Sequence, residues 1–269
     1  MKAIIIGGGS IGTRHANNLQ SLNIETRTVD VDEIQNIKTI LEEGYDFGFV
    51  CSPNIYHVEH CMLLAEYGIP TFCEKPFYTD REGVNQLLEL VSKKQLTNMV
   101  GCNLRFTPEV ESIKEDTRYI SAYLGYNLKK WRPGTDHLKS YSANKSLGGG
   151  ILLDAIHELD YLYSKFGSID KIYFNKYKLS DITIDTEDLV VGRIEFKSGT
   201  LADFNLNYLS EDYHRYYDIL EGDTLRRINF NISNQMYVEE IKYFVNQVLN
   251  KDVCINSFRE ADNLLKHLV

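Results

Sequence analysis

A glycine-rich turn lies between the first apolar run of this chain and its first helical segment. The residues Gly7-Gly8-Gly9-Ser10-Ile11-Gly12 have the spacing G-x-G-x-x-G and directly follow the run Ala3–Ile6. Between a strand and a helix, the first glycine permits a tight turn, the second lets the backbone approach a pyrophosphate, and the third lets helix and strand pack closely. The helix N-terminus adds N–H groups and the positive end of its dipole. We therefore predict a dinucleotide site formed by Gly7, Gly9, Ser10, Ile11 and Gly12, the alternative being a plain strand-to-helix turn.

Short β-branched runs alternate with helical stretches over residues 1–117. The expected strands are Ala3–Ile6, Thr26–Val29, Phe47–Val50, Thr71–Cys73 and Met99–Gly101. The expected helices are Ile11–Leu22, Glu33–Glu42, Ile55–Tyr67, Arg81–Lys94 and Pro108–Asp116. Such alternation indicates βαβ units and a parallel sheet, so residues 1–117 are predicted to form an α/β dinucleotide-binding domain.

The pattern changes after residue 117, where strand-like runs follow one another without helices between them. These runs are Tyr119–Leu128, Lys171–Leu179, Leu189–Phe196, Leu201–Leu209 and Tyr216–Leu220, with Lys197-Ser198-Gly199-Thr200 as a hairpin turn. The expected helices are Ile151–Phe166, entered through Gly148-Gly149-Gly150, then Met236–Asn250 and Phe258–Leu268. Residues 118–269 are therefore predicted to form an α+β domain on an open, mainly antiparallel sheet.

Composition limits the classes of partner. The formal charge of −9 disfavours a nucleic-acid or membrane-surface binder, because both surfaces are anionic. The apolar run that begins the chain is too short for a signal peptide or a membrane span, so we expect a cytoplasmic protein without a membrane partner. The 5 cysteines are odd in number and contain no C-x-x-C, which favours reduced core thiols and predicts no metal site.

Asp30 follows the second expected strand and indicates the choice of cofactor. A carboxylate at this point can accept hydrogen bonds from both ribose hydroxyls and repels a 2′-phosphate, so NAD is expected and NADP is less favoured. Three alternatives stay open. Asp32 is close enough to be the ribose contact, Arg27 could compensate the charge of a phosphate, and Asp30 could instead cap the next helix.

Three further segments follow expected strands, where ligands of such sheets bind. They are Cys51-Ser52-Pro53-Asn54-Ile55-Tyr56-His57, Cys73-Glu74-Lys75-Pro76 and Gly101-Cys102-Asn103-Leu104-Arg105-Phe106. Together with the glycine turn, and with Gly148-Gly149-Gly150 followed by Asp154, His157 and Asp160, they occur in an order that spans nearly the whole chain. In this order of motifs the chain resembles the glucose–fructose oxidoreductase / inositol dehydrogenase (Gfo/Idh/MocA) family.

The resemblance implies a Rossmann domain, and an α+β domain whose open sheet often forms oligomers. It also implies hydride transfer between NAD(P) and a secondary alcohol of a sugar, with Lys75 and His157 as the catalytic pair. The residues expected at the cofactor, besides the glycine turn and Asp30, are Ser52, Pro53, Asn54, His57, Glu74 and Lys75. A homodimer or homotetramer through the C-terminal sheet is expected.

The chemistry of these residue types agrees with the implied roles. Hydride leaves an alcohol carbon readily only when the hydroxyl proton is removed, and imidazole is the usual base near neutral pH. A lysine ammonium stabilises the developing alkoxide. Asp154 and His157 are three residues apart on the expected helix and so share a face, which makes Asp154 the third catalytic candidate, with Asp160 as a competing partner of the histidine. The family usually has its acid one residue further from the histidine, so Asp154 departs from the family pattern.

Residues 129–145 form a locally basic segment in this acidic chain. It contains Lys129, Lys130, Arg132, Lys139 and Lys145 against Asp136, together with the only tryptophan, Trp131. Positive charge favours an anionic substrate, and an aromatic ring suits a sugar face, although a solvated loop would have the same composition. The expected substrate contacts are Arg105, Trp131, Arg132, Tyr141, Asp154 and His157. The run also resembles the family branch associated with sialic-acid-type surface sugars.

These observations predict an NAD(P)-dependent sugar dehydrogenase that acts on an anionic or nucleotide-activated sugar. One alternative is a non-catalytic regulator or scaffold of the same fold that binds the dinucleotide. The presence of both Lys75 and His157 argues against it, since a protein that only binds needs no base. A redox-assisted glycosidase that retains its NAD is a further alternative.

Overall fold

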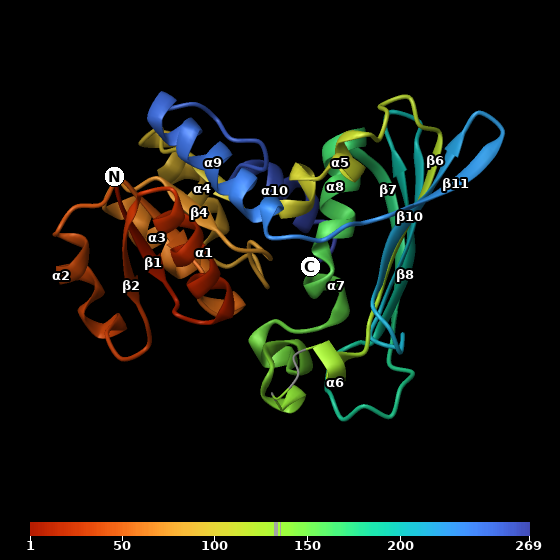
Figure 1. The fold of residues 1–269 in the computed structure, drawn as a ribbon, viewed down its shortest axis with the longest axis horizontal. Coiled ribbons are helices and arrows are strands. Elements are labelled where there is room, and N and C mark those ends of the chain that lie inside the picture. The colour runs from red at the N-terminus through yellow and green to blue at the C-terminus, as the bar shows by residue number, and fades with distance from the viewer. Residues whose placement is uncertain (132–133, 135) are drawn as a thin grey trace. The chain divides into compact units, whose positions relative to one another are not determined.

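The computed structural model describes residues 1–131, 134 and 136–269 of the chain, which pack into two compact units (Figure 1). Residues 1–103 and 234–269 form the first unit, and residues 104–233 form the second. The predicted division at residues 117 and 118 differs from this packing, because the C-terminal helices belong with the first unit. The two units are described separately below.

The first unit contains a five-stranded parallel sheet, as predicted. The strand order is β2-β1-β3-β4-β5, so the chain starts near the middle of the sheet and extends it in both directions. Because the strands are parallel, the residues that follow them lie at one common edge. The strands are β1 (Lys2–Ile6), β2 (Glu25–Val29), β3 (Phe47–Val50), β4 (Thr71–Cys73) and β5 (Asn98–Val100).

Helices and an aromatic core complete the first unit. The helices are α1 (Ser10–Ser21), α2 (Ile37–Leu41), α3 (His57–Glu66), α4 (Val84–Lys93), α9 (Gln235–Asn250) and α10 (Phe258–Leu265). Phe244 of α9 packs edge-on against Phe47, Phe49 and Phe72 of the sheet, with ring centroids 5.6 to 5.8 Å apart. On edge strand β5, the backbone N–H of Val100 donates to the carbonyl oxygen of Asn256 at 2.9 Å. These contacts explain why residues 234–269 pack with the parallel sheet.

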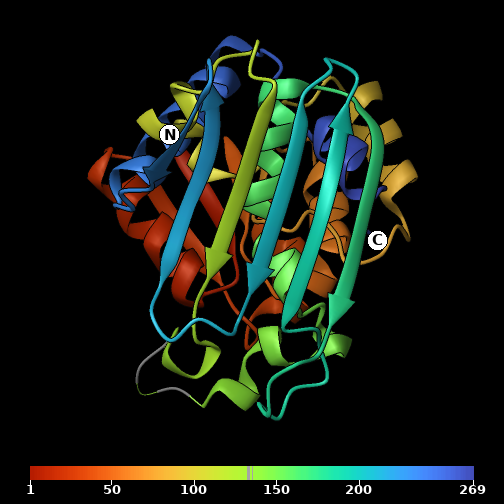
Figure 2. The same cartoon turned by 90° about the vertical axis from the view of Figure 1, so that its right-hand side faces the viewer.

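The second unit contains a six-stranded sheet, shown face-on in Figure 2, in the order β11-β10-β6-β9-β8-β7. The pair β6–β9 is parallel and the other four pairs are antiparallel, which confirms the predicted mainly antiparallel sheet. The hairpin predicted at residues 197–200 joins β8 to β9. The strands are β6 (Tyr119–Gly125), β7 (Ile169–Tyr177), β8 (Leu189–Phe196), β9 (Leu201–Asn207), β10 (His214–Glu221) and β11 (Thr224–Asn229).

One face of this sheet is covered by helix α8 (Ile156–Phe166), which packs on β6 and β9. The buried residues alternate along the strands, as in Val190, Ile194 and Phe196 of β8. The residues between them form the outer face of the sheet, which carries tyrosines and ion pairs such as Arg193–Asp203. Because these charges are paired within the sheet, the outer face is compatible with solvent as well as with a partner.

Several predicted elements differ in extent from the observed ones. The helix expected over Pro108–Asp116 is only α5 (Pro108–Glu111). The strand expected to reach Leu128 ends at Gly125, because Asn127 accepts the N–H of Lys129 and starts α6 (Leu128–Trp131). Strand β11 was not predicted, since its side chains are mostly exposed and lack an apolar alternation.

The helix expected over Ile151–Phe166 is interrupted at Ala155, which has φ −96° and ψ 22°. It is therefore divided into α7 (Ile151–Asp154) and α8.

The turn before α7 needs glycine. A Cβ at Gly149 would lie 2.1 Å from the carbonyl oxygen of Tyr141, and one at Gly150 would lie 2.5 Å from a carboxylate oxygen of Glu187. The same Glu187 oxygen accepts the N–H of Leu152 at 3.2 Å at the start of α7.

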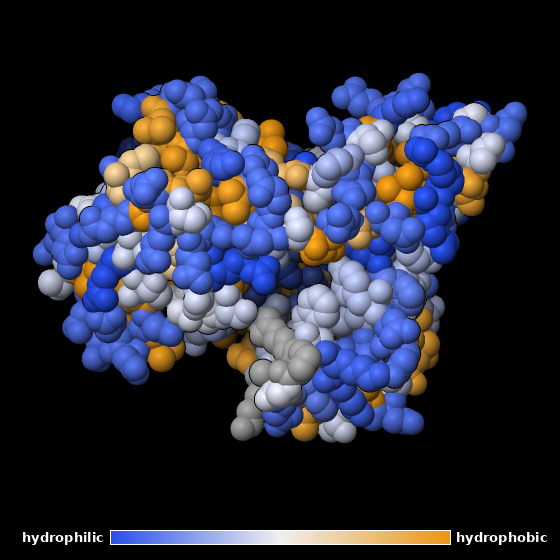
Figure 3. All heavy atoms as spheres, in the orientation of Figure 1, coloured by the Kyte–Doolittle hydropathy of each residue, from blue (hydrophilic) through white to orange (hydrophobic). Residues whose placement is uncertain are grey.

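Most of the face drawn in Figure 3 is hydrophilic, and its apolar residues lie in small groups. All five cysteines are buried and none of them forms a disulfide. Within the described parts of the chain, no helix combines the length and the apolar character needed to cross a membrane. Nor does any group of three or more His, Cys, Asp or Glu side chains among the described residues have an arrangement that could hold a metal ion.

Candidate cofactor and catalytic residues

The glycine turn after β1 has the close backbone packing expected of a dinucleotide-binding turn. Gly7 has φ +106°, and a Cβ there would lie 2.5 Å from the carbonyl oxygen of Cys51. A Cβ at Gly12 would lie 1.9 Å from the carbonyl oxygen of Gly7, so neither position accepts a larger residue without rearrangement. Gly9, the N-cap of α1, would place a Cβ in open space, and no side chain caps this helix. The first turn of α1 is therefore open to an anionic ligand.

Asp30 follows β2 and lies against the glycine turn. A Cβ at Gly8 would be 2.6 Å from Asp30 Oδ2, while Oδ1 accepts the N–H of Val31 at 2.9 Å. The next helical turn begins after Glu33 and has no side-chain cap, so Asp30 does not cap it. The guanidinium of Arg27 donates to Glu33 at 2.6 Å. Arg27 is therefore engaged by a carboxylate of its own chain.

Ser52, Pro53 and Asn54 follow β3, where two histidines of α3 hold the segment. His60 Nδ1 lies 2.8 Å from the Ser52 hydroxyl, and His57 Nε2 lies 2.8 Å from the Ser52 carbonyl oxygen. Burial, with His57 nearby, lowers the pKa of His60 to about 4. Pro53 is exposed and Asn54 is buried. The serine predicted to contact the cofactor is thus fixed through its hydroxyl and its carbonyl.

Glu74, Lys75 and Pro76 follow β4. The backbone N–H of Lys75 donates to Glu74 Oε2 at 3.2 Å, and Lys75 itself is half-buried. Glu74 Oε1 lies 2.6 Å from Nε2 of His15, a fully buried side chain of α1. Burial favours the neutral acid, but the hydrogen bond from His15 outweighs it and lowers the pKa of Glu74. Sequence reasoning missed His15, which stands three residues after Gly12.

In the second unit, Asp154 is the last residue of α7 and is held by two tyrosines. It accepts a hydrogen bond from the Tyr208 hydroxyl at 2.6 Å and from the Tyr126 hydroxyl at 3.4 Å. Burial and the nearby Asp154 carboxylate raise the pKa of both phenols well above its usual value, so both stay protonated donors. Neither tyrosine could be linked to Asp154 from the sequence, since each follows a strand far from Asp154 in the chain.

His157 lies in the first turn of α8 and is 9% exposed. Because Ala155 interrupts the helix, Asp154 ends α7 while His157 belongs to α8, so the continuous helix expected under both residues is not observed. Asp160 accepts two hydrogen bonds from Arg105, at 2.7 Å from Nε and 2.8 Å from Nη2. Both side chains are almost fully buried. Asp154 thus accepts hydrogen bonds from two tyrosines, and Asp160 accepts two from an arginine.

The aromatic residues near α6 are in contact with one another. Trp131, 47% exposed, has its ring centroid 4.6 Å from that of Tyr126 and 5.6 Å from that of Tyr213. Lys130, beside it, forms an ion pair with Glu211, which reduces the positive charge of the basic segment. Tyr141 is half-buried in a short 3₁₀ turn. Arg132, the other predicted substrate contact here, lies outside the described residues.

Comparison with known proteins decides the family. Residues 1–102 match the model described as "Oxidoreductase family, NAD-binding Rossmann fold", and residues 120–224 match the model described as "GFO/IDH/MocA C-terminal domain". The chain belongs to the GFO/IDH/MocA family. This membership confirms the resemblance drawn from the ordered motifs, and it makes the parallel sheet of the first unit an NAD-binding Rossmann domain.

Two members of the GFO/IDH/MocA family are similar to this chain at low sequence identity. The chain is 24% identical over 226 residues to an uncharacterized oxidoreductase, YrbE, of Bacillus subtilis, covering 74% of this chain and 64% of the relative. It is 26% identical over 230 residues to a myo-inositol 2-dehydrogenase of Thermotoga maritima, covering 75% and 67%. The matches thus span about two thirds of these relatives' length.

A solved structure agrees over nearly the whole fold. The UDP-N-acetylglucosamine 3-dehydrogenase GnnA of Acidithiobacillus ferrooxidans superposes with a TM-score of 0.79 at 15% identity, covering 99% of this chain and 94% of that one. At this level of identity the likeness shows the fold of this GFO/IDH/MocA protein and leaves its substrate to be argued.

Proposed function

We propose that this GFO/IDH/MocA protein transfers a hydride between NAD and a secondary alcohol or ketone of a sugar. The observation that supports this best is the position of Lys75. It follows β4 at the carboxyl edge of the same sheet whose first turn is packed for a pyrophosphate. A cation at that edge of a Rossmann sheet is suited to stabilise an alkoxide formed beside a bound nicotinamide.

We further propose NAD rather than NADP as the cofactor. The open first turn of α1 would hold the pyrophosphate, and the Asp30 carboxylate would accept hydrogen bonds from the ribose hydroxyls. A 2′-phosphate would meet the charge of Asp30, and Arg27, the cation considered for compensation, is paired with Glu33. NAD supplies the hydride acceptor of the reaction when it is bound.

The proton chemistry is assigned to this chain's own residues. His157 is the proposed base that accepts the hydroxyl proton of the alcohol while the hydride leaves the carbon. Lys75 is the proposed cation that stabilises the oxygen as it becomes negative, and in the reverse direction it polarises the ketone. Asp154, held as an acceptor by Tyr126 and Tyr208, is proposed to orient the sugar or the histidine.

For the substrate we propose an anionic or nucleotide-activated sugar. Two names among the similar proteins agree with the wider class, a myo-inositol 2-dehydrogenase and a UDP-N-acetylglucosamine 3-dehydrogenase. The half-exposed ring of Trp131, tilted against Tyr126 and stacked on Tyr213, is of the flat apolar kind against which sugar rings pack. Lys129 and Lys145 supply the basic segment with positive charges that could bind a carboxylate or a phosphate.

Turnover by two variants tests the catalytic assignment. Reduction of NAD by a panel of sugar acids and nucleotide sugars identifies a substrate for the wild-type protein. His157→Asn is then expected to lower kcat by roughly 10²- to 10⁴-fold, and Lys75→Met by a similar factor, because each loses the group that acts on the alcohol. The Kd for NADH should stay near its wild-type value in His157→Asn.

Controls separate this result from a general loss of fold. Lys266→Met and His267→Asn change the same residue types at exposed positions near the C-terminus, and both should keep wild-type turnover. Near-native kcat in His157→Asn and Lys75→Met would contradict the assignment. If the wild-type protein binds NADH but oxidises no sugar of the panel, the regulator or scaffold function replaces the enzymatic one.

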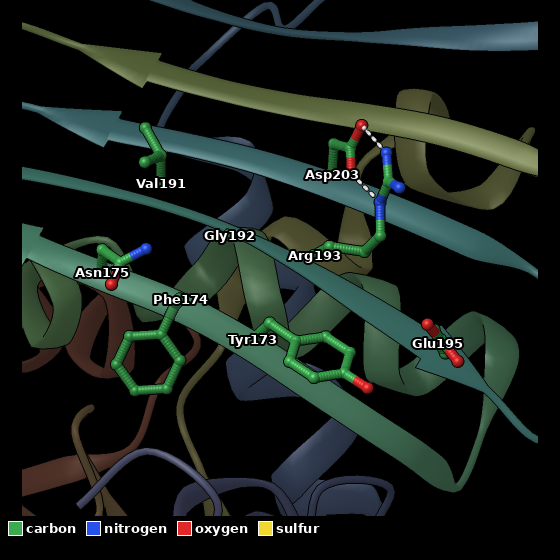
Figure 4. A pocket seen from close by; sticks show the side chains of 8 residues that line it. All are labelled: Tyr173, Phe174, Asn175, Val191, Gly192, Arg193, Glu195 and Asp203. Atoms are coloured by element: carbon green, nitrogen blue, oxygen red, sulfur yellow. Dashed lines mark hydrogen bonds and ion pairs between the residues drawn. The ribbon is translucent and has the colours of Figure 1, made fainter.

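We also propose that the chain forms a dimer or tetramer through the outer face of the six-stranded sheet. Figure 4 shows a shallow hollow on the six-stranded sheet of the second unit. It is formed by Tyr173 and Phe174 of β7, residues of β8, and Asp203 of β9. Tyr173 is 55% exposed. Beside it, Arg193 reaches Asp203 in a two-pronged ion pair, with nitrogen–oxygen distances of 2.6 and 2.9 Å. A planar ring beside paired charges suits a self-complementary contact between two copies.

A further inference from the structure

Two buried histidines hold the segment that carries Lys75, one on each side of it. His15 of α1 binds the side chain of Glu74, and His57 of α3 lies 2.7 Å through Nδ1 from the carbonyl oxygen of Pro76. His15 is fully buried and His57 is 1% exposed. The residues before and after Lys75 are therefore each anchored to a different helix of the Rossmann domain.

The geometry of His57 defines its protonation. Its Nδ1 faces the Pro76 carbonyl oxygen at 2.7 Å, and its Nε2 faces the Ser52 carbonyl oxygen at 2.8 Å. A carbonyl oxygen only accepts hydrogen bonds, so both ring nitrogens must carry a proton to make both bonds. His57 is thus an imidazolium that ties the segment after β3 to the segment after β4.

His15 is placed by its aromatic surroundings. Its ring packs against both Phe49 and Phe72, with centroids 5.1 and 5.3 Å away, and lies 6.2 Å from the ring of Tyr237. Its Nδ1 is buried and has no hydrogen-bond partner, while Nε2 faces the Glu74 carboxylate. His15 therefore donates through Nε2, and the helix that begins at the glycine turn is connected directly to the residue before Lys75.

We propose that His15 and His57 are positioning residues that fix the backbone at Lys75 by holding Glu74 and Pro76. This inference rests on the proposed function of Lys75, since its consequence for turnover requires Lys75 to act on the substrate. Neither histidine needs to touch the substrate. They act by fixing Lys75, because displacing a catalytic group by about 1 Å can cost about 100-fold in rate.

The kinetic test uses a pair of variants at position 15. His15→Phe keeps an aromatic ring among Phe49 and Phe72 but cannot donate to Glu74. His15→Gln keeps an amide donor. We expect kcat to fall about 10- to 100-fold in His15→Phe, with the Kd for NADH changed less than about threefold, and to be largely restored in His15→Gln.

Tyr78→Phe is the matched control. Tyr78 stands two residues after Pro76, is 1% exposed, and donates to Asp262 at 2.9 Å, so this variant also removes one buried hydrogen bond from the same segment. Its kcat should stay within about twofold of the wild-type value. Equal kcat for His15→Phe and the wild-type protein, with both folded, would overturn the proposal.

Two measurements do not depend on turnover. Hydrogen exchange of the amides at residues 74–77 should be faster in His15→Phe and in His57→Phe than in the wild-type protein and Tyr78→Phe, while the amides of β1 keep wild-type rates. Nitrogen NMR of the wild-type protein should show both ring nitrogens of His57 protonated at about pH 7. Unchanged exchange, or a nitrogen of His57 without a proton, overturns the proposal even if no substrate has been found. A wild-type protein without sugar turnover, but with these exchange and NMR results, instead rejects only the function of Lys75.

Discussion

Raising the pH through neutrality should weaken the folded state through His57. Burial of this ring opposes its charged form, but the Cys73 sulfur and the carbonyl oxygens of Pro76 and Ser52 favour that form, and its pKa rises from 6.5 to about 9. A group whose pKa is higher in the folded than in the unfolded state stabilises the fold when protonated. The stabilisation is thus complete below about pH 6.5 and is lost as the pH rises towards about 9.

The size of the effect follows from the difference between the two pKa values. A difference from 6.5 to about 9 corresponds to about 3 kcal/mol of unfolding free energy at low pH, of which about 2 kcal/mol is lost between about pH 6 and about pH 8.5. Other titratable groups face the ring. Burial raises the pKa of the Cys73 thiol well above its usual value, and Glu74, whose pKa is lowered, stays charged. His60 is already neutral, since its pKa is about 4.

Urea unfolding of the wild-type protein and His57→Gln across this pH range tests the prediction. The difference in unfolding free energy between the two should shrink by about 2 kcal/mol from about pH 6 to about pH 8.5, because only the wild-type protein carries the titrating ring. His60→Gln is the control on the same helix. Since the pKa of His60 is lowered, the wild-type protein should differ from this variant by a constant amount over the same range. A pH-independent difference between the wild-type protein and His57→Gln would refute the assignment of a buried imidazolium.

Two further predictions concern the cofactor and the outer face of the sheet. Calorimetry should show NADH binding more tightly than NADPH by about tenfold or more, and Asp30→Ala should narrow this ratio, because it removes the charge that repels a 2′-phosphate; equal affinities in the wild-type protein would contradict the role of Asp30. Light scattering at micromolar concentration should show a dimer or tetramer that Tyr173→Glu dissociates, while Val253→Glu, at an exposed position of the first unit, does not. A monomeric wild-type mass would reject the proposed contact.

The order of strands and helices could be predicted from the sequence because periodicity and turn residues act over short distances. The five parallel strands and the hairpin between β8 and β9 follow from such local patterns. The placement of residues 234–269 could not be predicted in this way. It depends on Phe244 fitting against three phenylalanines of the parallel sheet, and this contact leaves no local pattern at the boundary near residue 117.

The same holds for the candidate site residues: their identities could be proposed from the sequence, but their contacts with distant residues could not. Lys75 and His157 could be proposed because the ordered motifs resemble those of a known family, and the implied reaction needs a cation and a base. The break at Ala155 could not be predicted, since Leu153 to Glu158 continue the helical pattern without proline or glycine. Likewise, the preference of Asp160 for Arg105 is a contact between residues 55 positions apart.

The Glu-Lys-Pro motif can be recognised in the sequence, but the contacts that hold it in place cannot, because the histidines that make them lie elsewhere in the chain. Glu74 and its partner His15 are 59 positions apart, and His57 and Pro76 are 19 apart. Each contact is buried, so either partner alone would leave a polar group without compensation. The glutamate of the Glu-Lys-Pro motif is therefore explained by a residue of the nucleotide-binding helix, and its role is to place the lysine. In this view the glycine turn and Lys75 are parts of one rigid arrangement, in which the helix that would receive the pyrophosphate also sets the position of the cation expected beside the nicotinamide.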